Sequence, residues 1–271
     1  MYIRGIGMKK TVTFIVKATN NKNKILRCMA SISRQKNENY RVIALCSSEG
    51  AKKQIEKNYP DFMIIDIENA AAFTEKLGEA FSLVDTEYAM LVNYDEVLAP
   101  NAVNVILSKK KDVVVFNGSV LKNSRFVPRY SYPDGFTLAG YMKSGFSVWN
   151  NAIRTSIIKN NSLSLDALDY CTQAMFLLRC YFHAESFSVT DEVIAYREKQ
   201  TAKTAITFGE FFENRKELES ILKNFSERGM LDEKEQMVSD FVLAQLGEVY
   251  RESSFFKRMK KKRLIKKMLG I

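Results

Sequence analysis

An apolar run that ends in acids is the part of the sequence best suited to chemistry. Residues 88–92, YAMLV, are typical of a buried strand, and Asn93, Asp95 and Glu96 follow directly. Burying a carboxylate is costly unless a cation pairs with it. The stretch therefore predicts that something cationic lies beside Asp95 and Glu96.

The segments that must position these acids alternate between two patterns. Apolar, β-branched runs predict strands at residues 11–17, 40–45, 62–67, 88–92, 113–117 and 186–195. Apolar residues at helical spacing predict helices at residues 24–33, 51–57, 73–84, 100–107, 153–159 and 170–182. This alternation indicates an α/β fold with a mainly parallel sheet covered on both faces. Ligands bind such sheets at the carboxyl ends of the strands, where the acids are expected.

The later parts of the chain have a different character. Residues 123–147 are rich in Tyr, Phe, Gly, Pro and Arg, and we interpret them as loops with a small hairpin that line a binding cleft. A capping-box pattern and apolar spacing predict two further helices up to about residue 250. We therefore divide the chain into an α/β domain (9–200), a helical appendage (205–250) and a tail (251–271).

The net charge of +10 is concentrated in that tail. Residues 251–271 hold nine Lys or Arg and one acid, whereas the rest of the chain has a net charge of only +2. This asymmetry argues against a nucleic-acid-binding body and favours a local anionic partner. Apolar residues spaced among the lysines are typical of an amphipathic helix on an anionic membrane surface. A solvated terminus is the alternative.

Composition narrows the chemistry further. The four cysteines form no C-x-x-C pair, so we expect free thiols in a reducing compartment rather than a zinc ribbon. His183 is the only histidine, which argues against Ser-His-Asp catalysis and multi-histidine metal sites. The sequence has neither an apolar run long enough to span a membrane nor a signal-peptide pattern, which predicts a cytoplasmic protein.

Four segments, in order and at consistent spacing, carry a resemblance to a known family. They are residues 31–45 (SISRQKNENYRVIAL), 86–103 (TEYAMLVNYDEVLAPNAV), 147–161 (SVWNNAIRTSIIKNN) and 191–199 (DEVIAYREK). Each resembles the corresponding segment of glycosyltransferase family 2. The resemblance covers roughly residues 10–200 and implies the GT-A fold, a Rossmann-like mixed sheet that binds nucleotide-diphospho-sugars.

The resemblance also implies an activity. A family member of this kind transfers a sugar from a nucleotide-sugar donor to a glycan or lipid-linked glycan acceptor, with inversion, in cell-surface polysaccharide synthesis. Many members act on lipid-linked acceptors, so a peripheral position at the inner face of a bacterial-type cell membrane is expected.

The family's D-x-D motif implies roles for the strand-end residues. That motif holds a divalent ion against the donor diphosphate, so Asp95 and Glu96 are the expected ligands of Mg²⁺ or Mn²⁺. Asn93 is expected at the donor ribose, and Asn20 matches the donor-site turn after the first strand. Arg197 would reach the diphosphate, or would lie on an edge strand without that role.

The family's catalytic base opens a helix, and two acids of this chain compete for that position. Asp169 fits best, and Asp166 is second. The base would deprotonate the acceptor hydroxyl. An acid at a helix start is also a common cap, so the structural interpretation of both stays open. Trp149 is expected in the core rather than against a sugar, and His183 at a helix boundary.

Departures from the family pattern leave two alternatives open. Asn93 replaces the first D-x-D acid, Cys46-Ser47-Ser48-Glu49 replaces the family's "DDGS", and the "ARN" motif expected at residues 76–78 is absent. Lys17 and Thr19 stand where the family has the Pro and Tyr of "PVYN". One alternative is a catalytically inactive pseudoenzyme that serves as a partner or scaffold subunit. The other is a transferase with an atypical donor, for example a cytidine nucleotide.

Overall fold

A computed structural model describes residues 10–19, 21–122, 125–128, 147–166, 168 and 170–198. These residues form an α/β fold, as predicted, and the domain boundaries at residues 9 and 200 stay a prediction. The helical appendage (205–250) and the tail (251–271) lie outside the described residues and stay predictions.

The described residues form nine strands in one sheet. In chain order the strands are β1 (Val12–Ala18), β2 (Tyr40–Cys46), β3 (Met63–Asp66), β4 (Tyr88–Asn93), β5 (Glu96–Leu98), β6 (Val113–Lys122), β7 (Arg125–Pro128), β8 (Asn151–Arg154) and β9 (Phe187–Glu198). The helices are α1 (Lys22–Ser33), α2 (Glu49–Asn58), α3 (Phe73–Leu83), α4 (Ala102–Lys109), α6 (Thr155–Asn160) and α7 (Tyr170–His183), with short 3-10 turns η1 (Ala70–Ala72) and η2 (Val148–Asn150).

The sheet is mixed but mainly parallel, as predicted. Its strand order is β3-β2-β1-β4-β8-β6-β9-β5, and β7 pairs with β6 as a hairpin. Strands β3, β2, β1 and β4 are parallel to one another, and β6 and β9 are parallel to each other. Strand β8 is antiparallel to both β4 and β6, so these two share one direction. The carboxyl ends of β1, β4 and β9 therefore lie at the same edge of the sheet.

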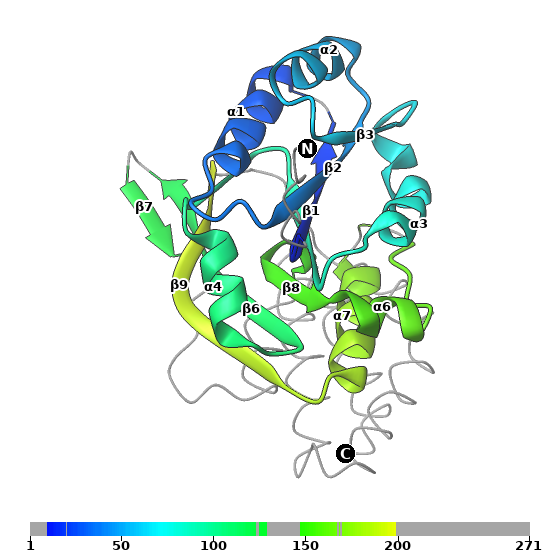
Figure 1. Cartoon of the computed structure of the whole chain (residues 1–271), viewed down its shortest axis with the longest axis vertical. Helices are drawn as coiled ribbons and strands as arrows, with labels where there is room; N and C mark the ends of the chain where they lie inside the picture. Colours follow the sequence, from blue (N-terminus) through cyan, green and yellow to red (C-terminus); the bar gives the residue numbers. More distant parts are fainter. Residues whose placement is uncertain are drawn as a thin grey trace, which may run out of the picture.

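Two apolar clusters cover the two faces of the sheet. One contains Ile15, Phe73 and Trp149 with side chains of α3, α6 and α7, and the other contains Phe14 and Met29 with side chains of α1, α2 and α4. Alternate residues of a strand point to opposite faces, which is why Phe14 and Ile15 belong to different clusters. Figure 1 shows α1 and α4 on one side of the sheet and α3, α6 and α7 on the other.

Two differences from the predicted elements matter for the site. Strand β5 was not predicted, because three residues give no periodicity, yet it pairs with β9. The predicted helix at 153–159 begins only at Thr155, because Ala152 and Ile153 pair with both β4 and β6. Pairing within the sheet outweighs the helical spacing there. Among the residues that the structure describes, no helix has the length and apolarity needed to cross a membrane.

Candidate functional site

The candidate site lies where the carboxyl ends of three strands meet. Lys17 of β1 and Asn93 of β4 are neighbours in the parallel register. Glu96 of β5 faces Arg197 of β9 in the antiparallel register. Asp95 lies in the short link between β4 and β5. Five side chains from the first, middle and last strands of the domain thus converge, and we call them the strand-end cluster.

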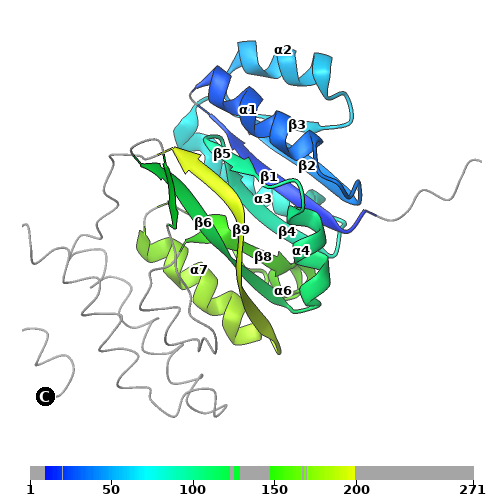
Figure 2. The same cartoon turned by 90° about the vertical axis from the view of Figure 1, so that its left-hand side faces the viewer.

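The shape of β9 explains how Arg197 reaches the cluster. Strand β8 pairs only with residues 88–90 of β4, so it does not extend to the carboxyl end of β4. The pairing between β6 and β9 shifts register at Phe116, Asn117 and Gly118, and such irregularities bend strands. Strand β9 then pairs with β5, and its curvature is visible in Figure 1 and Figure 2.

A buried ion pair dominates the cluster. The Arg197 Nε donates a hydrogen bond of 2.9 Å to the Asp95 Oδ2. The Asp95 side chain is fully buried, and the Arg197 side chain is 10% exposed. Removing one partner of such a pair leaves an uncompensated charge in the interior. The cation that the acidic strand end predicts is therefore, in this structure, a guanidinium of the protein itself.

Glu96 is also committed to the protein. Its Oε2 accepts a 2.9 Å hydrogen bond from the backbone N–H of Asn93, and the residue is only 3% exposed. This bond closes the turn between β4 and β5 and fixes the position of Asp95 within it. The interaction assigns a structural role to one carboxylate oxygen of Glu96.

Asn93 presents an oxygen to this turn that the described residues leave unused. Its Oδ1 is buried and accepts no hydrogen bond from them. Buried polar atoms are normally paired, so an unpaired acceptor at the carboxyl end of a strand calls for a donor from elsewhere. A ribose hydroxyl is a donor of the kind that the sequence predicts here.

Lys17 adds a second cation. Its Nζ lies 5.2 Å from the centre of the Phe73 ring, and the described residues place no carboxylate within ion-pair distance of it. Burial lowers the pKa of Lys17, and repulsion by Arg197 lowers it further, while Asp95 has a smaller opposite effect. Lys17 thus carries the positive charge of the cluster that is least compensated.

Helix α1 and the residues just after it form hydrogen bonds with the link between β5 and α4. The Gln35 Nε2 donates to the Ala99 carbonyl at 2.7 Å, and its Oε1 accepts from the Val103 N–H at 3.2 Å. The Ser31 Oγ accepts from the Leu98 N–H at 3.0 Å. These two residues belong to the segment that resembles the family, and their contacts give that resemblance a physical reason.

The arrangement of the cluster fits a divalent ion poorly. The Asp95 Oδ2 bonds to Arg197 and the Glu96 Oε2 to a backbone amide, so neither carboxylate is wholly available. An ion placed between Asp95 and Asn93 would also be repelled by Lys17 and Arg197. No group of three or more His, Cys, Asp or Glu side chains is suitably placed for a metal in the described part of the chain.

The remaining predicted site residues are only partly placed. Asn20 and Asp169 lie outside the described residues. Asp166 is exposed in the segment that leads into α7. The first turn of α7 is tied to η2, because the Gln173 Oε1 accepts from the Val148 N–H at 3.5 Å.

Two sequence-based interpretations away from the cluster agree with the structure. Trp149 is 7% exposed and its ring centre lies 6.3 Å from that of Phe73, so it belongs to the core. His183 is the last residue of α7 and contacts Phe182 edge-on, as expected of a boundary residue.

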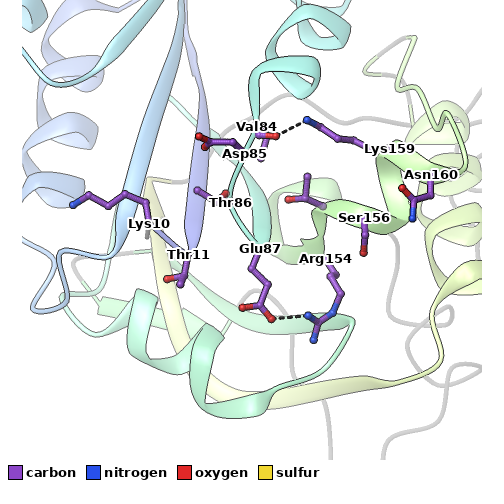
Figure 3. Close-up of a pocket in the computed structure, with 11 residues that line it drawn as sticks. Lys10, Thr11, Val84, Asp85, Thr86, Glu87, Arg154, Ser156, Lys159 and Asn160 are labelled. Atoms are coloured by element: carbon purple, nitrogen blue, oxygen red, sulfur yellow. Dashed lines mark hydrogen bonds and ion pairs between the residues drawn. The ribbon is translucent and has the colours of Figure 1, made fainter. Parts of the chain in front are cut away.

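A cavity at the opposite end of the sheet does not compete with this site. It measures about 600 Å³ and is lined by Lys10 and residues near the amino ends of β1 and β4 (Figure 3). Its cations are occupied: Arg154 pairs with Glu87 and Asp112, Lys159 donates to the carbonyls of Ser82 and Val84, and Lys10 donates to the Glu38 carbonyl. We interpret these ion pairs and hydrogen bonds around the cavity as structural.

Sequence reasoning named four members of the cluster but gave no role to Lys17. The available signal was the same as for Asp95: a charged residue at the end of an apolar strand, TVTFIVK. The pairing of Asp95 with Arg197 was not predictable, because it depends on the unpredicted strand β5.

The comparisons with known proteins concern the fold. No family model and no curated protein sequence matches the chain. Residues 1–349 of S. aureus TarS, solved with UDP-GlcNAc, match with a TM-score of 0.72 and 16% identity, over 92% of this chain and 77% of that one. The mannosyltransferase PcManGT of Pyrobaculum calidifontis, in complex with GDP-Man and Mn²⁺, matches with a TM-score of 0.50 and 10% identity, over 96% and 81%.

At these identities the likeness carries the fold and not the chemistry, so membership of family 2 stays a prediction. The mixed sheet of this chain agrees with these two matches. The chain therefore has a GT-A-type fold.

Proposed function

We propose that this protein is a glycosyltransferase that moves a sugar from a nucleotide-sugar donor to a glycan or lipid-linked glycan in cell-surface polysaccharide synthesis. The observation that carries the proposal is the strand-end cluster. In open α/β sheets ligands bind at the carboxyl ends of the strands, and here that edge holds cations and a buried acceptor.

The donor nucleotide occupies this edge in the proposal. The Asn93 Oδ1 accepts a hydrogen bond from a ribose hydroxyl, which satisfies the buried oxygen. Arg197 faces the diphosphate, with its guanidinium held by Asp95 through Nε. Asn20, which follows β1 in the sequence and lies outside the described residues, completes the proposed donor-binding set.

The proposed reaction is a single displacement with inversion. The acceptor hydroxyl oxygen attacks the anomeric carbon, and the bond from that carbon to the β-phosphate oxygen breaks. The nucleoside diphosphate departs with the electron pair of the broken bond. A carboxylate takes the acceptor proton; Asp169 is the first candidate for this base and Asp166 the second.

Two observations bear on these candidates. The exposure of Asp166 suits a group that must meet a large acceptor. The tie between Gln173 and η2 attaches the start of α7 to an element that packs on β4. Replacing each acid with Asn separates their roles: loss of turnover with retained nucleotide binding identifies the base.

Calorimetric titration tests the proposal directly. UDP, GDP, CDP and CMP are added to the purified protein, with and without Mn²⁺, and Asn93→Ala is titrated beside the wild type. One nucleotide should bind, and the variant should bind it roughly tenfold more weakly because one hydrogen bond is lost. Failure of all four nucleotides to bind under both conditions would overturn the proposed function.

The titration also decides two finer questions. The identity of the binding nucleotide names the donor base, and a preference for CDP or CMP would establish the atypical cytidine donor. Use of Mg²⁺ or Mn²⁺ with Asp95 and Glu96 as ligands stays a prediction from the sequence, and the paired titrations test whether nucleotide binding requires Mn²⁺.

A specific observation favours the pseudoenzyme as second candidate. Asp95 and Glu96 are both bonded to other groups of the protein, as in a fold that keeps its shape without its metal chemistry. This alternative predicts no nucleotide binding and a stable protein partner. Co-purification from the native source, followed by mass spectrometry of the complex, identifies that partner.

A further inference from the structure

We propose that Lys17 and Arg197 together bind the donor diphosphate, so that two side-chain cations take the place of a divalent ion. Asp95 then acts as a positioning residue that orients Arg197. The inference rests on the proposed function, because it assigns the diphosphate subsite of the same donor site.

The geometry of Arg197 supports the first half of this assignment. Its single described carboxylate bond uses Nε, and its two terminal Nη groups make no hydrogen bond to the described residues. A guanidinium offers five N–H donors in a fixed plane. Fixing one edge of that plane on the fully buried Asp95 leaves the other donors for phosphate oxygens.

The position of Lys17 supports the second half. It ends β1 beside Asn93, on the sheet face that carries Phe73. Packing of Nζ over the Phe73 ring keeps the ammonium at the strand end although no described carboxylate pairs with it. Lys17 therefore keeps a charge for an anionic ligand.

Electrostatics in the cluster favours an anion over a further cation. Arg197 and Lys17 repel each other, and this repulsion together with burial lowers the pKa of Lys17. A diphosphate between the two side chains would relieve that repulsion, whereas a divalent ion would increase it. The leaving group needs the same charge, because negative charge develops on the diphosphate as the bond to the sugar breaks.

The test measures binding of UDP, GDP and CDP by calorimetry, first in EDTA and then in Mn²⁺. The nucleotide that binds should do so in EDTA within about threefold of its affinity in Mn²⁺. Lys17→Met should weaken diphosphate binding roughly 10- to 100-fold, the range for a lost charged hydrogen bond. Lys17→Arg should retain most of the affinity.

Lys10→Met is the matched control. Lys10 also packs over an aromatic ring, with its Nζ 5.9 Å from the centre of Tyr40, but it lies at the opposite end of the sheet (Figure 3). This variant should bind like the wild type. The matching nucleoside without phosphates should bind Lys17→Met and the wild type equally, which a misfolded site would not do.

The outcomes separate this inference from the proposed function. Binding that requires Mn²⁺ and vanishes in EDTA would overturn the inference and leave the proposed function intact. So would unchanged affinity in Lys17→Met. If none of UDP, GDP and CDP binds in either condition, the inference fails, and the proposed function fails with it only when CMP does not bind either.

Discussion

Asp95 is the residue whose surroundings differ most from the sequence-based expectation. A metal-binding Asp95 would point toward the bound donor, and its replacement would leave the fold intact. In the structure it is fully buried and neutralises Arg197. A loss of activity on replacing Asp95 could therefore come from a changed site or from a less stable fold. Activity and the free energy of unfolding must be measured separately.

The first prediction concerns the stability that this pair contributes. Asp95→Ala should lower the free energy of unfolding by roughly 3–5 kcal/mol, because Arg197 is left buried without its partner. Asp95→Asn should cost less, because its amide oxygen still accepts from Nε. Urea denaturation of Asp95→Ala, Arg197→Ala and the double variant completes the cycle. Additive costs would show that the two side chains do not interact.

The second prediction concerns the stability cost of Lys17. A lysine with a lowered pKa binds fewer protons when folded than when unfolded, so its burial destabilises the fold below that pKa. Lys17→Met should therefore be more stable at pH 7, by roughly 0.5–1 kcal/mol because solvent screens a part-buried charge.

The pH dependence supplies the check on Lys17. Stability of the wild type should rise relative to Lys17→Met as pH increases through the lowered pKa toward the ordinary value of 10.5. The measurement is the difference in melting temperature between the two proteins across pH 7 to 10. If the difference in melting temperature stayed constant across this pH range, the lowered pKa of Lys17 would be contradicted.

At the scale of elements, helix α1 and the β5–α4 link act as one unit. Gln35, which follows the C-cap of α1, is 6% exposed and bonds to two backbone groups of that link, and Ser31 of α1 bonds to a third. These contacts hold β5 in register with β9, and that register brings Arg197 to Asp95.

The third prediction tests this unit through Gln35. Gln35→Ala should lower the free energy of unfolding by roughly 1–3 kcal/mol, because it leaves the Val103 N–H without its acceptor and removes one of two donors to the Ala99 carbonyl, which keeps its bond from the Ala102 N–H. Gln35→Glu keeps the acceptor for Val103 but places a buried carboxylate oxygen against the Ala99 carbonyl, so it should cost at least as much. Nucleotide affinity should fall with stability in the first variant, as followed by calorimetry. If Gln35→Ala were destabilised but bound the nucleotide with unchanged affinity, the contacts of Gln35 would not contribute to the geometry of the site.

Much of this architecture was predictable from sequence periodicity, and the reasons for the exceptions are physical. The buried strand that ends in Asn93 and the helix that carries Met29 have long, regular patterns. Strand β5 has only three residues, and they form a strand because they pair with β9. Asp95 and Arg197, which this pairing brings together, are 102 residues apart in the sequence. Asp95 was recognisable as a functional position, but its partner was not, because that contact exists only in the folded sheet.

At the scale of the whole molecule, charge is distributed unevenly between the body and the tail. The described domain supplies the strand-end cluster, whereas residues 251–271 supply a net charge of +8. The sequence predicts that this tail binds an anionic membrane surface. Such a location would bring the site to lipid-linked acceptors.

The fourth prediction tests the tail. The full chain should bind vesicles that contain anionic lipid and should release them in high salt, because each basic residue contributes about 1 kcal/mol of screened attraction. A variant truncated after residue 250 should not bind, and vesicles of neutral lipid are the control. Flotation in a sucrose gradient gives the measurement. Equal binding by the truncated protein would assign the membrane contact elsewhere.

The continuity of β9 has a consequence for how the protein is made. Arg197 lies near the end of the last described strand and binds Asp95, 102 residues earlier in the chain. A contact of such long range forms late in folding, since the intervening chain must be ordered first. During synthesis on a ribosome, the first hundred residues emerge with Asp95 but without its partner Arg197. If the proposed function holds, a nascent chain cannot bind the donor diphosphate through Arg197 until β9 has left the exit tunnel and joined the sheet.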